Sequence, residues 1–365
     1  MRKLVFIFGN NAALSQAEIR AVTGASFSVV NDLFGIIETD TQQLVDINKL
    51  GGTIKIAELI GEDITPEPIV AALLAAPSAG RINFGISFYR CRPSLIGMKV
   101  KGALAERGVR SRLVTSREPV LSSVIVTKEK CQEFLILENK YLARTIAVQD
   151  FEEYGRRDFG RPERDMYSGT LPPKLCQIML NLAKQPASAR ILDPFCGSGT
   201  MIQEALLLGY ITIIGSDASP RAIADTKRNL EWLAGTGIDC SHVELLQADV
   251  RDIDRRIKSG PVDAVITEPY LGPPLKGSEP RQRLEQIQAE LTALYHDACV
   301  ALSRIVKPGG VLVMVFPAMR YRNETLHLPY ERILHQTPWR RLDDGTLVYK
   351  RADQKLWRFV GILQR

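Results

Sequence analysis

ARILDPFCGSGTMIQEALLLGYITIIGSD, residues 189–217, holds two short apolar runs on either side of a helical pattern. The first run ends at Asp193 and the second at Asp217, and Gly197 and Gly199 lie in the turn before the helix. This order predicts a strand, a glycine turn, a helix and a second strand. Such a βαβ unit belongs to a doubly wound sheet, in which the strand ends border the ligand crevice.

The spacing of the acids indicates the kind of ligand. A dinucleotide fingerprint reads G-x-G-x-x-G and has an acid about 20 residues later. Here Asp193 precedes the glycines, and no third glycine stands at the expected place. A carboxylate there repels a pyrophosphate but attracts an ammonium group, and Asp217 stands where it can accept both hydroxyls of a ribose. The predicted ligand is therefore S-adenosylmethionine. A βαβ unit whose turn is only structural is the alternative.

Composition limits the remaining choices. The chain has 365 residues, 45% of them hydrophobic, which is enough for two or three domains with cores of their own. Its formal charge of +6 fits a polyanionic partner. The 6 cysteines include no C-x-x-C pair, so neither a metal site nor a disulfide framework is expected. No apolar run of about 18 residues occurs, so we expect no membrane association and a cytoplasmic location.

The N-terminal part reads as small alternating strands and helices, which predicts a compact α+β module. Ser15 and Glu18 have the spacing of a capping box, with Ser15 at the start of a helix over 15–22. Further strands are predicted at 124–126, 134–137 and 145–148. The segment 150–170 is polar and poor in apolar residues, which predicts a linker between domains.

Basic residues gather between Arg81 and Arg117, where Glu106 is the one acid. Phe84, Phe88 and Tyr89 lie among them. Basic residues interleaved with aromatic ones favour contact with a nucleic-acid backbone, and a helix predicted over 94–106 would expose two of the lysines. A solvated charged face is the alternative. The predicted RNA-binding residues are Arg90, Arg92, Lys99, Lys101, Arg110 and Arg112.

A second half of the sheet is predicted after residue 217. Strands are expected at 243–246, 262–266 and 311–316, and helices at 220–233 and 282–306. The tail, 346–363, is expected to close the sheet with an antiparallel hairpin. Before the glycine turn, Leu171-Pro172-Pro173-Lys174 opens a predicted helix, because proline is tolerated in the first helical turn.

The fourth predicted strand ends in Thr267-Glu268-Pro269-Tyr270. Amino-group methyltransferases carry [D/N/S]-P-P-Y at this place. There the first side chain and a backbone carbonyl accept the hydrogens of the amine, and the aromatic ring stacks on an unstacked base. The alignment of the reacting groups then supplies most of the catalysis.

These motifs together resemble one family. D-P-F-C-G-S-G-T, x-x-P-Y, L-P-P-K-L and L-S-x-A-E-I are similar to the THUMP-domain tRNA guanine-10 N2-methyltransferases of archaea and eukaryotes and their bacterial relatives. The resemblance covers nearly the whole chain. It implies a ferredoxin-like region over 1–60, a THUMP-like RNA-binding domain over 61–149, the linker 150–170 and a methyltransferase domain over 171–365.

The resemblance also implies fold and activity. The expected fold is α/β, with a Rossmann-like class I methyltransferase domain whose seven-stranded, mostly parallel sheet ends in an antiparallel strand. The expected reaction is S-adenosylmethionine-dependent methylation of the exocyclic N2 of a guanine in tRNA, at position 10. Ribosomal RNA or DNA as the substrate, and a non-catalytic binding protein, remain alternatives. A partner subunit and a homo-oligomer are both left open.

The family's site residues map onto this chain with one departure. The family tetrad D-P-P-Y reads Thr267-Glu268-Pro269-Tyr270 here, so that aligning on Pro-Tyr puts Thr267 at the acid position and Glu268 at the first proline. Either Thr267 accepts one hydrogen of the amine, or Glu268 supplies the carboxylate. All four residues are candidate catalytic residues. The implied cofactor-binding residues are Leu171, Asp193, Pro194, Phe195, Gly197, Gly199, Thr200, Asp217, Ala218, Asp249 and Val250.

Overall fold

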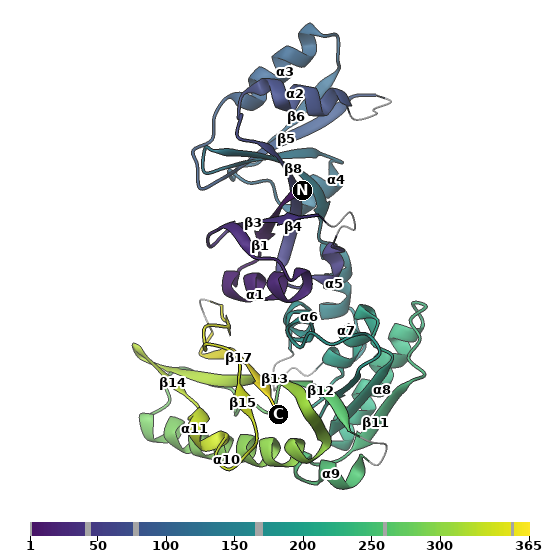
Figure 1. Ribbon diagram of the computed structural model, residues 1–365, viewed down its shortest axis with the longest axis vertical. Helices are drawn as coiled ribbons and strands as arrows, with labels where there is room; N and C mark the ends of the chain where they lie inside the picture. The colour runs from purple at the N-terminus through teal and green to yellow at the C-terminus, as the bar shows by residue number, and fades with distance from the viewer. Residues whose placement is uncertain (1, 41–44, 76–79, 165–170, 258–260, 352–353) are drawn as a thin grey trace. The chain divides into compact units, whose positions relative to one another are not determined.

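The computed structural model describes residues 2–40, 45–75, 80–164, 171–257, 261–351 and 354–365. The chain forms two compact units, whose elements are labelled in Figure 1. The N-terminal unit comprises Met1–Ala12, Thr23–Asn48 and Gly52–Glu152. The C-terminal unit comprises Ala13–Val22, Lys49–Gly51 and Glu153–Arg365.

The N-terminal unit is built on one eight-stranded sheet with the order β2-β3-β1-β4-β8-β7-β5-β6. Strand β5 runs parallel to β6 and β7, and the other neighbours are antiparallel. Because β4 pairs with β8, the strands of the two expected modules, 1–60 and 61–149, join in a single sheet. The strands are β1 (Arg2–Phe8), β2 (Phe27–Val30), β3 (Phe34–Thr39), β4 (Thr53–Gly61), β5 (Ile82–Tyr89), β6 (Ser111–Val114), β7 (Gln132–Leu137) and β8 (Tyr141–Val148).

Helices α2 (Pro66–Ala75) and α3 (Ile96–Glu106) share a hydrophobic core with β5 and β7. Helix α3 confirms the prediction over 94–106. The strand predicted at 124–126 is wrong, because these residues lie in helix α4 (Ser123–Lys128). The hydroxyl of Ser122 accepts the N–H of Ile125 and thereby caps this helix. The β-branched side chains suggested a strand, but the cap decided the local structure.

Helix α1 (Ala12–Thr23) extends beyond the predicted 15–22, and its residues 13–22 belong to the C-terminal unit. Ser15 therefore lies inside the helix and is not its N-cap. The carboxylate of Glu18 accepts the N–H of Gly51 and the Nδ2 of Asn181, each at 2.8 Å. The predicted capping box is wrong, because the helix already begins at Ala12, three residues before Ser15. A short 3-10 turn, η1 (Ile47–Lys49), also lies in this region.

The C-terminal unit contains a nine-stranded sheet whose main order is β11-β10-β9-β12-β13-β17-β15. Strands β9 to β13 pair in parallel, and β17 is antiparallel to β13, β15 and β16. This confirms a mostly parallel sheet with an antiparallel closing strand. Two short strands, β14 and β15, add to the predicted seven, and β16 pairs with β17 as the predicted closing hairpin. The strands are β9 (Arg190–Asp193), β10 (Thr212–Asp217), β11 (Val243–Gln247), β12 (Val262–Thr267), β13 (Val306–Tyr321), β14 (Glu324–His327), β15 (Arg340–Arg341), β16 (Val348–Tyr349) and β17 (Leu356–Gln364).

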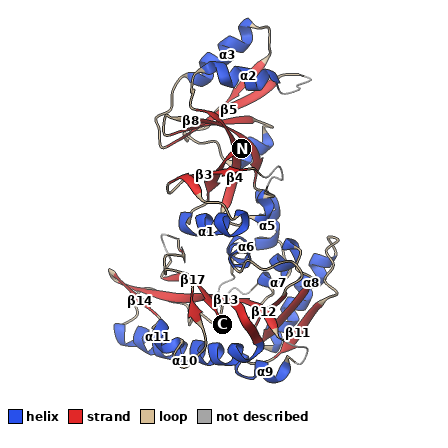
Figure 2. Cartoon of the chain, viewed as in Figure 1, coloured by secondary structure: helices blue, strands red, loops and turns tan. Residues whose placement is uncertain are grey.

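Helices cover both faces of this sheet, as Figure 2 shows for α7 and α8 on one face and α10 on the other. Successive strand residues face opposite sides. Ile191 and Ile213 join the core of α6, α7 and α8, whereas Leu192 and Ile214 join the core of α10. The helices and turns are α5 (Phe151–Phe159), α6 (Pro173–Leu182), α7 (Thr200–Leu208), α8 (Pro220–Ala234), η2 (Val250–Asp252), α9 (Ile253–Arg256), α10 (Arg281–Ile305) and α11 (Tyr330–Ile333).

The described part of the expected linker, 150–164, is not an extended connection. It contains α5, in which Tyr154 and Arg157 are buried. Their partners, Gln177 and Glu204, lie 23 and 47 residues away along the chain. The burial of Tyr154 and Arg157 could therefore not be predicted from the apolar pattern of the neighbouring sequence. Residues 165–170 lie outside the described part of the chain.

Within the described ranges, no helix is both long and apolar enough to cross a bilayer. In those same ranges, no group of three or more His, Cys, Asp or Glu residues is arranged to hold a metal ion.

Candidate active site

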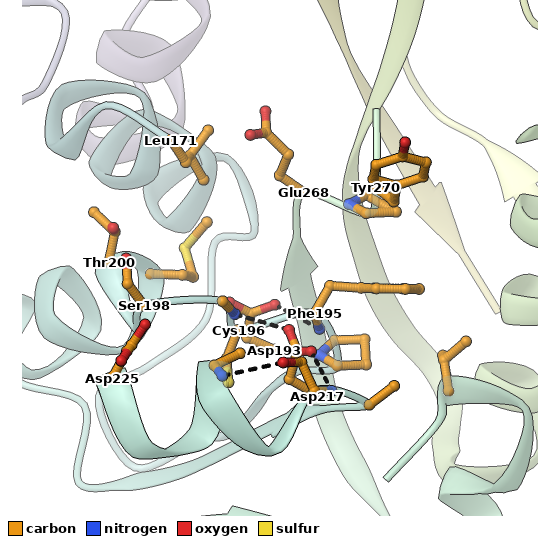
Figure 3. A pocket seen from close by; sticks show the side chains of 18 of the residues that line it. Leu171, Asp193, Phe195, Cys196, Ser198, Thr200, Asp217, Asp225, Glu268 and Tyr270 are labelled. Carbon is orange, nitrogen blue, oxygen red and sulfur yellow. Dashed lines mark hydrogen bonds between the residues drawn. The ribbon is translucent and has the colours of Figure 1, made fainter. Parts of the chain in front are cut away.

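A cavity of about 610 Å³ opens at the carboxyl ends of the parallel strands β9, β10, β11 and β12. The strand order reverses between β9 and β12, and ligands of doubly wound sheets bind at such a switch point. Figure 3 shows Asp193 and Asp217 at the floor of this cavity, with Leu171 on one side and Tyr270 on the other. The volume is typical of a site for a small molecule.

The glycine turn forms one wall of the cavity. Gly197 and Gly199 have φ angles of +53° and +81°, which only glycine adopts without strain. A Cβ atom on Gly199 would also lie 2.8 Å from Cγ2 of Thr226. The hydroxyl of Thr226 donates to the carbonyl of Gly197 at 2.8 Å and holds the turn in place. Gly199 shapes this turn without itself lining the cavity.

Asp217 connects the turn to the end of β10. Its Oδ2 accepts the N–H of Gly197 at 3.0 Å, and its Oδ1 accepts the N–H of Ser219 at 2.9 Å. A carboxylate offers about four lone pairs, so these two bonds leave capacity for a ligand. Asp217 lines the cavity and can therefore still receive hydroxyl groups.

Asp193 is the most deeply buried acid of the cavity wall, at 3% exposure. Its Oδ1 accepts the hydroxyl of Thr267 at 2.6 Å and the N–H of Phe195 at 3.2 Å. Burial raises the pKa of Asp193 to about 7, although both hydrogen bonds oppose the rise. A cationic group bound beside it would favour the charged form.

Thr267 does not line the cavity, and its side chain is fully buried. The carboxylate that does line the cavity at this strand end belongs to Glu268. It forms an ion pair with Arg358 of β17, in which Nε lies 2.5 Å from Oε2 and Nη2 lies 3.3 Å from Oε1. Burial raises the pKa of Glu268, and Arg358 opposes that rise. Of the two alternatives left open by the sequence, the geometry favours Glu268.

Tyr270 lies at the mouth of the cavity and is 50% exposed. Such an exposed ring has one face available for stacking. The hydroxyl of Tyr295, which is fully buried, donates to the backbone carbonyl of Tyr270 at 3.4 Å and supports the loop from below. Pro269 lies between Glu268 and Tyr270 and also lines the cavity.

Asp249 and Val250 follow β11 and line the cavity beyond Asp217. Both oxygens of Asp249 accept bonds from the guanidinium of Arg251, at 2.9 and 2.6 Å. These bonds lower the pKa of Asp249. The side chain is therefore a charged acceptor, and its position suits an exocyclic amine.

Of the fifteen candidate catalytic and cofactor-binding residues, thirteen line the cavity, and Gly199 and Thr267 support it from outside. Other lining residues were not predicted from the sequence, including Ser198, Met201, Ser219 and Asp225. Ser198 lies within the motif D-P-F-C-G-S-G-T and Met201 directly follows it, so both could have been found there. Arg164, Leu271 and Leu294 also line the cavity and belong to no recognised motif.

The six predicted RNA-binding residues divide into two groups. Arg90 pairs with Asp32 at 2.8 Å, and Arg112 pairs with Glu129 at 2.7 Å. The others are exposed and form no ion pair within the described residues: Arg92, Lys99, Lys101 and Arg110.

Two of the three aromatic residues near them do not belong to this surface. Phe84 and Tyr89 are 0% and 5% exposed and point to opposite faces of β5, each into a core of the unit. Phe88 is only partly buried. The expected interleaving of basic and aromatic residues is therefore wrong for Phe84 and Tyr89, because β5 is covered on both faces.

Comparison with known proteins shows what this part of the chain is similar to. Residues 161–328 match the family model UPF0020, described as RMKL-like, methyltransferase domain. The chain is similar to the tRNA (guanine(10)-N2)-dimethyltransferase of Methanothermobacter thermautotrophicus, with 32% identity over 184 residues, 50% of this chain and 49% of that protein. It is also similar to the tRNA (guanine(6)-N2)-methyltransferase of Thermus thermophilus, with 29% identity over 158 residues, 42% of each chain. Over this region the chain is thus similar to guanine N2-methyltransferases.

The chain spans about half the length of the curated relatives it matches. Among solved structures, TrmN from Thermus thermophilus covers 100% of both chains with a TM-score of 0.57 and 18% sequence identity. A likeness at this identity establishes the fold. It confirms the predicted α/β fold with a Rossmann-like methyltransferase domain.

Proposed function

We propose that this chain, whose residues 161–328 match the model of the RMKL-like methyltransferase domain, transfers a methyl group from S-adenosylmethionine to the exocyclic N2 of a guanine in tRNA. The observation that carries the proposal is the carboxylate of Glu268, which lines the cavity and is held by an ion pair with Arg358. The exposed ring of Tyr270 lines the same cavity. The names of the curated relatives agree with this substrate.

The residues of the cavity fit the proposed cofactor. Asp193, buried and of raised pKa, suits the ammonium group. Asp217 has lone pairs for the ribose hydroxyls, and Asp249 offers a charged acceptor to the amine of adenine. Gly197 lines the cavity and has no side chain that could occupy it. When bound, S-adenosylmethionine supplies an electrophilic methyl group.

Glu268 is the group that would orient the target amine. Its carboxylate accepts an N–H of the amine and so turns the nitrogen lone pair toward the methyl group. No strong base is needed before transfer, because the proton leaves after the nitrogen has become cationic. Alignment of this kind can contribute about 7–11 kcal/mol. Tyr270 provides the surface on which the unstacked base rests.

The same carboxylate explains a preference for guanine. On its pairing edge, guanine presents N1–H beside N2–H, and one carboxylate can accept both donors side by side. Adenine and cytosine present a lone pair beside their amine instead. That lone pair would face the negative charge of Glu268, which disfavours both bases.

We assign RNA contact to the N-terminal unit. Its unpaired basic residues, Arg92, Lys99, Lys101 and Arg110, are exposed and carry no acidic partner within the described residues. Such charges bind phosphates without reading the sequence. The choice of nucleotide then depends on the whole unit, and position 10 and position 6 are the two positions that the relatives' names offer.

The test is incubation with methyl-labelled S-adenosylmethionine and unmodified tRNA, followed by nucleoside analysis and mapping of the labelled position. Label in N2-methylguanosine or N2,N2-dimethylguanosine is expected. Glu268→Gln should lower the rate at least 100-fold while leaving S-adenosylhomocysteine binding unchanged. Glu285→Gln, which changes an exposed acid of α10, is the matched control. Label in N6-methyladenosine or N4-methylcytosine would overturn the role of Glu268 in base choice.

A further inference from the structure

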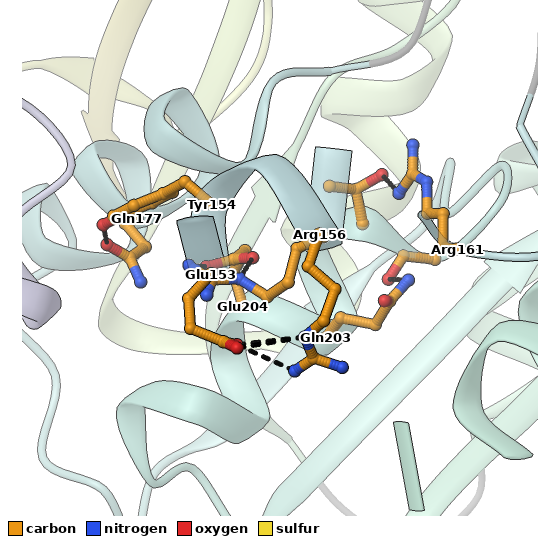
Figure 4. A network of polar contacts seen from close by, with 10 residues as sticks. Glu153, Tyr154, Arg156, Arg161, Gln177, Gln203 and Glu204 are labelled. Atoms are coloured by element: carbon orange, nitrogen blue, oxygen red, sulfur yellow. Dashed lines mark hydrogen bonds and ion pairs between the residues drawn. The ribbon is translucent and has the colours of Figure 1, made fainter. Parts of the chain in front are cut away.

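Among the residues that the structure describes, a buried arginine beside the cavity has no carboxylate partner. Arg161 is 3% exposed, and its Nη1 donates to Oγ1 of Thr200, which lines the cavity. Its Nε and Nη2 are buried and form no hydrogen bond within the part of the chain that the structure describes. Figure 4 shows this side chain next to the polar contacts of α5. A guanidinium remains charged, and a buried charge without a partner is costly.

The buried acid that acts electrostatically on Arg161, Glu204, is already engaged. Glu204 is 0% exposed, and its Oε1 accepts Nε of Arg157 at 2.7 Å. Arg157 also reaches the second oxygen of Glu204, at 3.4 Å. Figure 4 shows Glu204 among these contacts. Two buried arginines thus share the neighbourhood of one buried carboxylate, and Arg157 binds it.

The position of Arg161 is fixed relative to the glycine turn. Asn229 of α8, fully buried, donates from Nδ2 to the carbonyls of Ser198 and Glu163 at 2.8 and 2.9 Å. Its Oδ1 accepts the N–H of Glu163 at 3.0 Å. One amide therefore joins the turn to the segment that carries Arg161. Arg164 of the same segment lines the cavity as a second cation.

The start of helix α7 adds positive potential at the same place. The helix begins at Thr200, and its N-cap, Gly199, has no side chain to accept the first N–H groups. Free N–H groups and the helix dipole favour an anion at such an end. The helix start and the unpartnered guanidinium are independent observations that point to the same ligand chemistry.

We propose that Arg161 binds the carboxylate of the amino-acid part of S-adenosylmethionine. The inference rests on the proposed function for the identity of the ligand. An amino acid carries both charges, so a complete site needs an acid for the ammonium and a cation for the carboxylate. Asp193 supplies the first, and Arg161, steadied by Thr200, supplies the second.

The test compares two ligands by titration calorimetry: S-adenosylhomocysteine and its decarboxylated analogue, which keeps the ammonium group. The wild-type protein should prefer the intact ligand by roughly 10- to 100-fold, the worth of a charge-assisted hydrogen bond. In Arg161→Gln this preference should fall to about threefold or less, while the analogue binds as before. Arg161→Lys should keep part of the preference.

Arg156→Gln is the matched control, because Arg156 lies on α5 and pairs with Glu153 outside the cavity. It should keep the full preference. Equal affinity of the wild-type protein for both ligands would overturn the inference, and this comparison does not depend on any variant folding correctly. If Arg161→Gln lowers the affinity for both ligands equally, the residue has a structural role only. Absence of any S-adenosylhomocysteine binding would instead overturn the proposed function.

Discussion

Arg358 and Glu268, 90 residues apart in sequence, form a two-point ion pair in which both side chains are about nine-tenths buried. The arginine comes from the antiparallel closing strand β17, whereas the acid follows β12. The pair fixes the orientation of the carboxylate, because a planar guanidinium fork holds both oxygens. Its presence also opposes the rise in the pKa of Glu268 that burial causes.

Arg358→Met should therefore reduce the free energy of unfolding by about 3–5 kcal/mol at pH 8, because it leaves a buried charge unpaired. The loss should shrink as the pH falls. Burial raises the folded-state pKa of Glu268, so protonation favours the folded state at low pH and this benefit disappears as the pH rises. Urea unfolding at pH 5.5 and pH 8 measures both values. A loss independent of pH would contradict the unpaired charge as its cause. Combining Arg358→Met with Glu268→Gln should restore part of the stability.

Cofactor binding should depend on the protonation of Asp193. Burial raises its pKa to about 7, so the carboxyl group of the free protein is protonated below that pH. A ligand ammonium favours the ionised form. S-adenosylhomocysteine affinity should therefore rise up to tenfold per pH unit between about pH 5 and 7, and level off above. Calorimetry in buffers of different ionisation enthalpy should detect proton release at pH 6. Asp193→Asn should bind more weakly and without this pH dependence.

Tyr270→Ala should spare S-adenosylhomocysteine binding and weaken the use of RNA. Loss of a base-stacking surface costs about 1–3 kcal/mol, which is a 5- to 150-fold decrease in kcat/KM. Tyr270→Phe keeps the ring and should retain most activity. Steady-state kinetics with tRNA measure both variants. Normal kinetics of the alanine variant would exclude the stacking role.

The affinity for tRNA should depend on salt concentration through the exposed basic residues of the N-terminal unit. Replacing Arg92, Lys99, Lys101 and Arg110 by glutamine should weaken tRNA binding, and each lost phosphate contact should reduce the slope of log K against log salt by about one. Replacing Arg90 and Arg112 is the matched comparison. Because these two already pair with acids, their loss should change the slope less per residue. Equal slopes per residue in the two sets would contradict this division.

The parts of the fold that depend on local pattern could be predicted. The strand before Asp193, the glycine turn and the helix after it follow from neighbouring residues, and α6, α8 and α10 begin within one or two residues of their expected starts. Helix α4 could not be predicted from Val124 and its apolar neighbours, because β-branched residues favour strands and the cap at Ser122 overrode that preference.

The candidate site could be predicted only where a motif supplies the side chain. The pairs Arg358–Glu268 and Arg161–Thr200 join residues 90 and 39 positions apart, and no spacing rule connects them. The choice between Thr267 and Glu268 also needed the structure. In sequence either could act, but the side chain of Thr267 is fully buried and does not line the cavity.

Helix α1 has a consequence for how the protein is made. Its residues 13–22 belong to the C-terminal unit, and Glu18 receives a bond from Asn181, 163 residues later in the chain. A 12-residue helix has only marginal stability on its own. Because the chain is synthesised from its N-terminus, this helix leaves the ribosome before the residues that stabilise it have been made. The C-terminal unit therefore completes its fold only after most of the polypeptide has been synthesised. A proteolytic fragment starting at residue 153 would lack residues 13–22, which are part of the C-terminal unit.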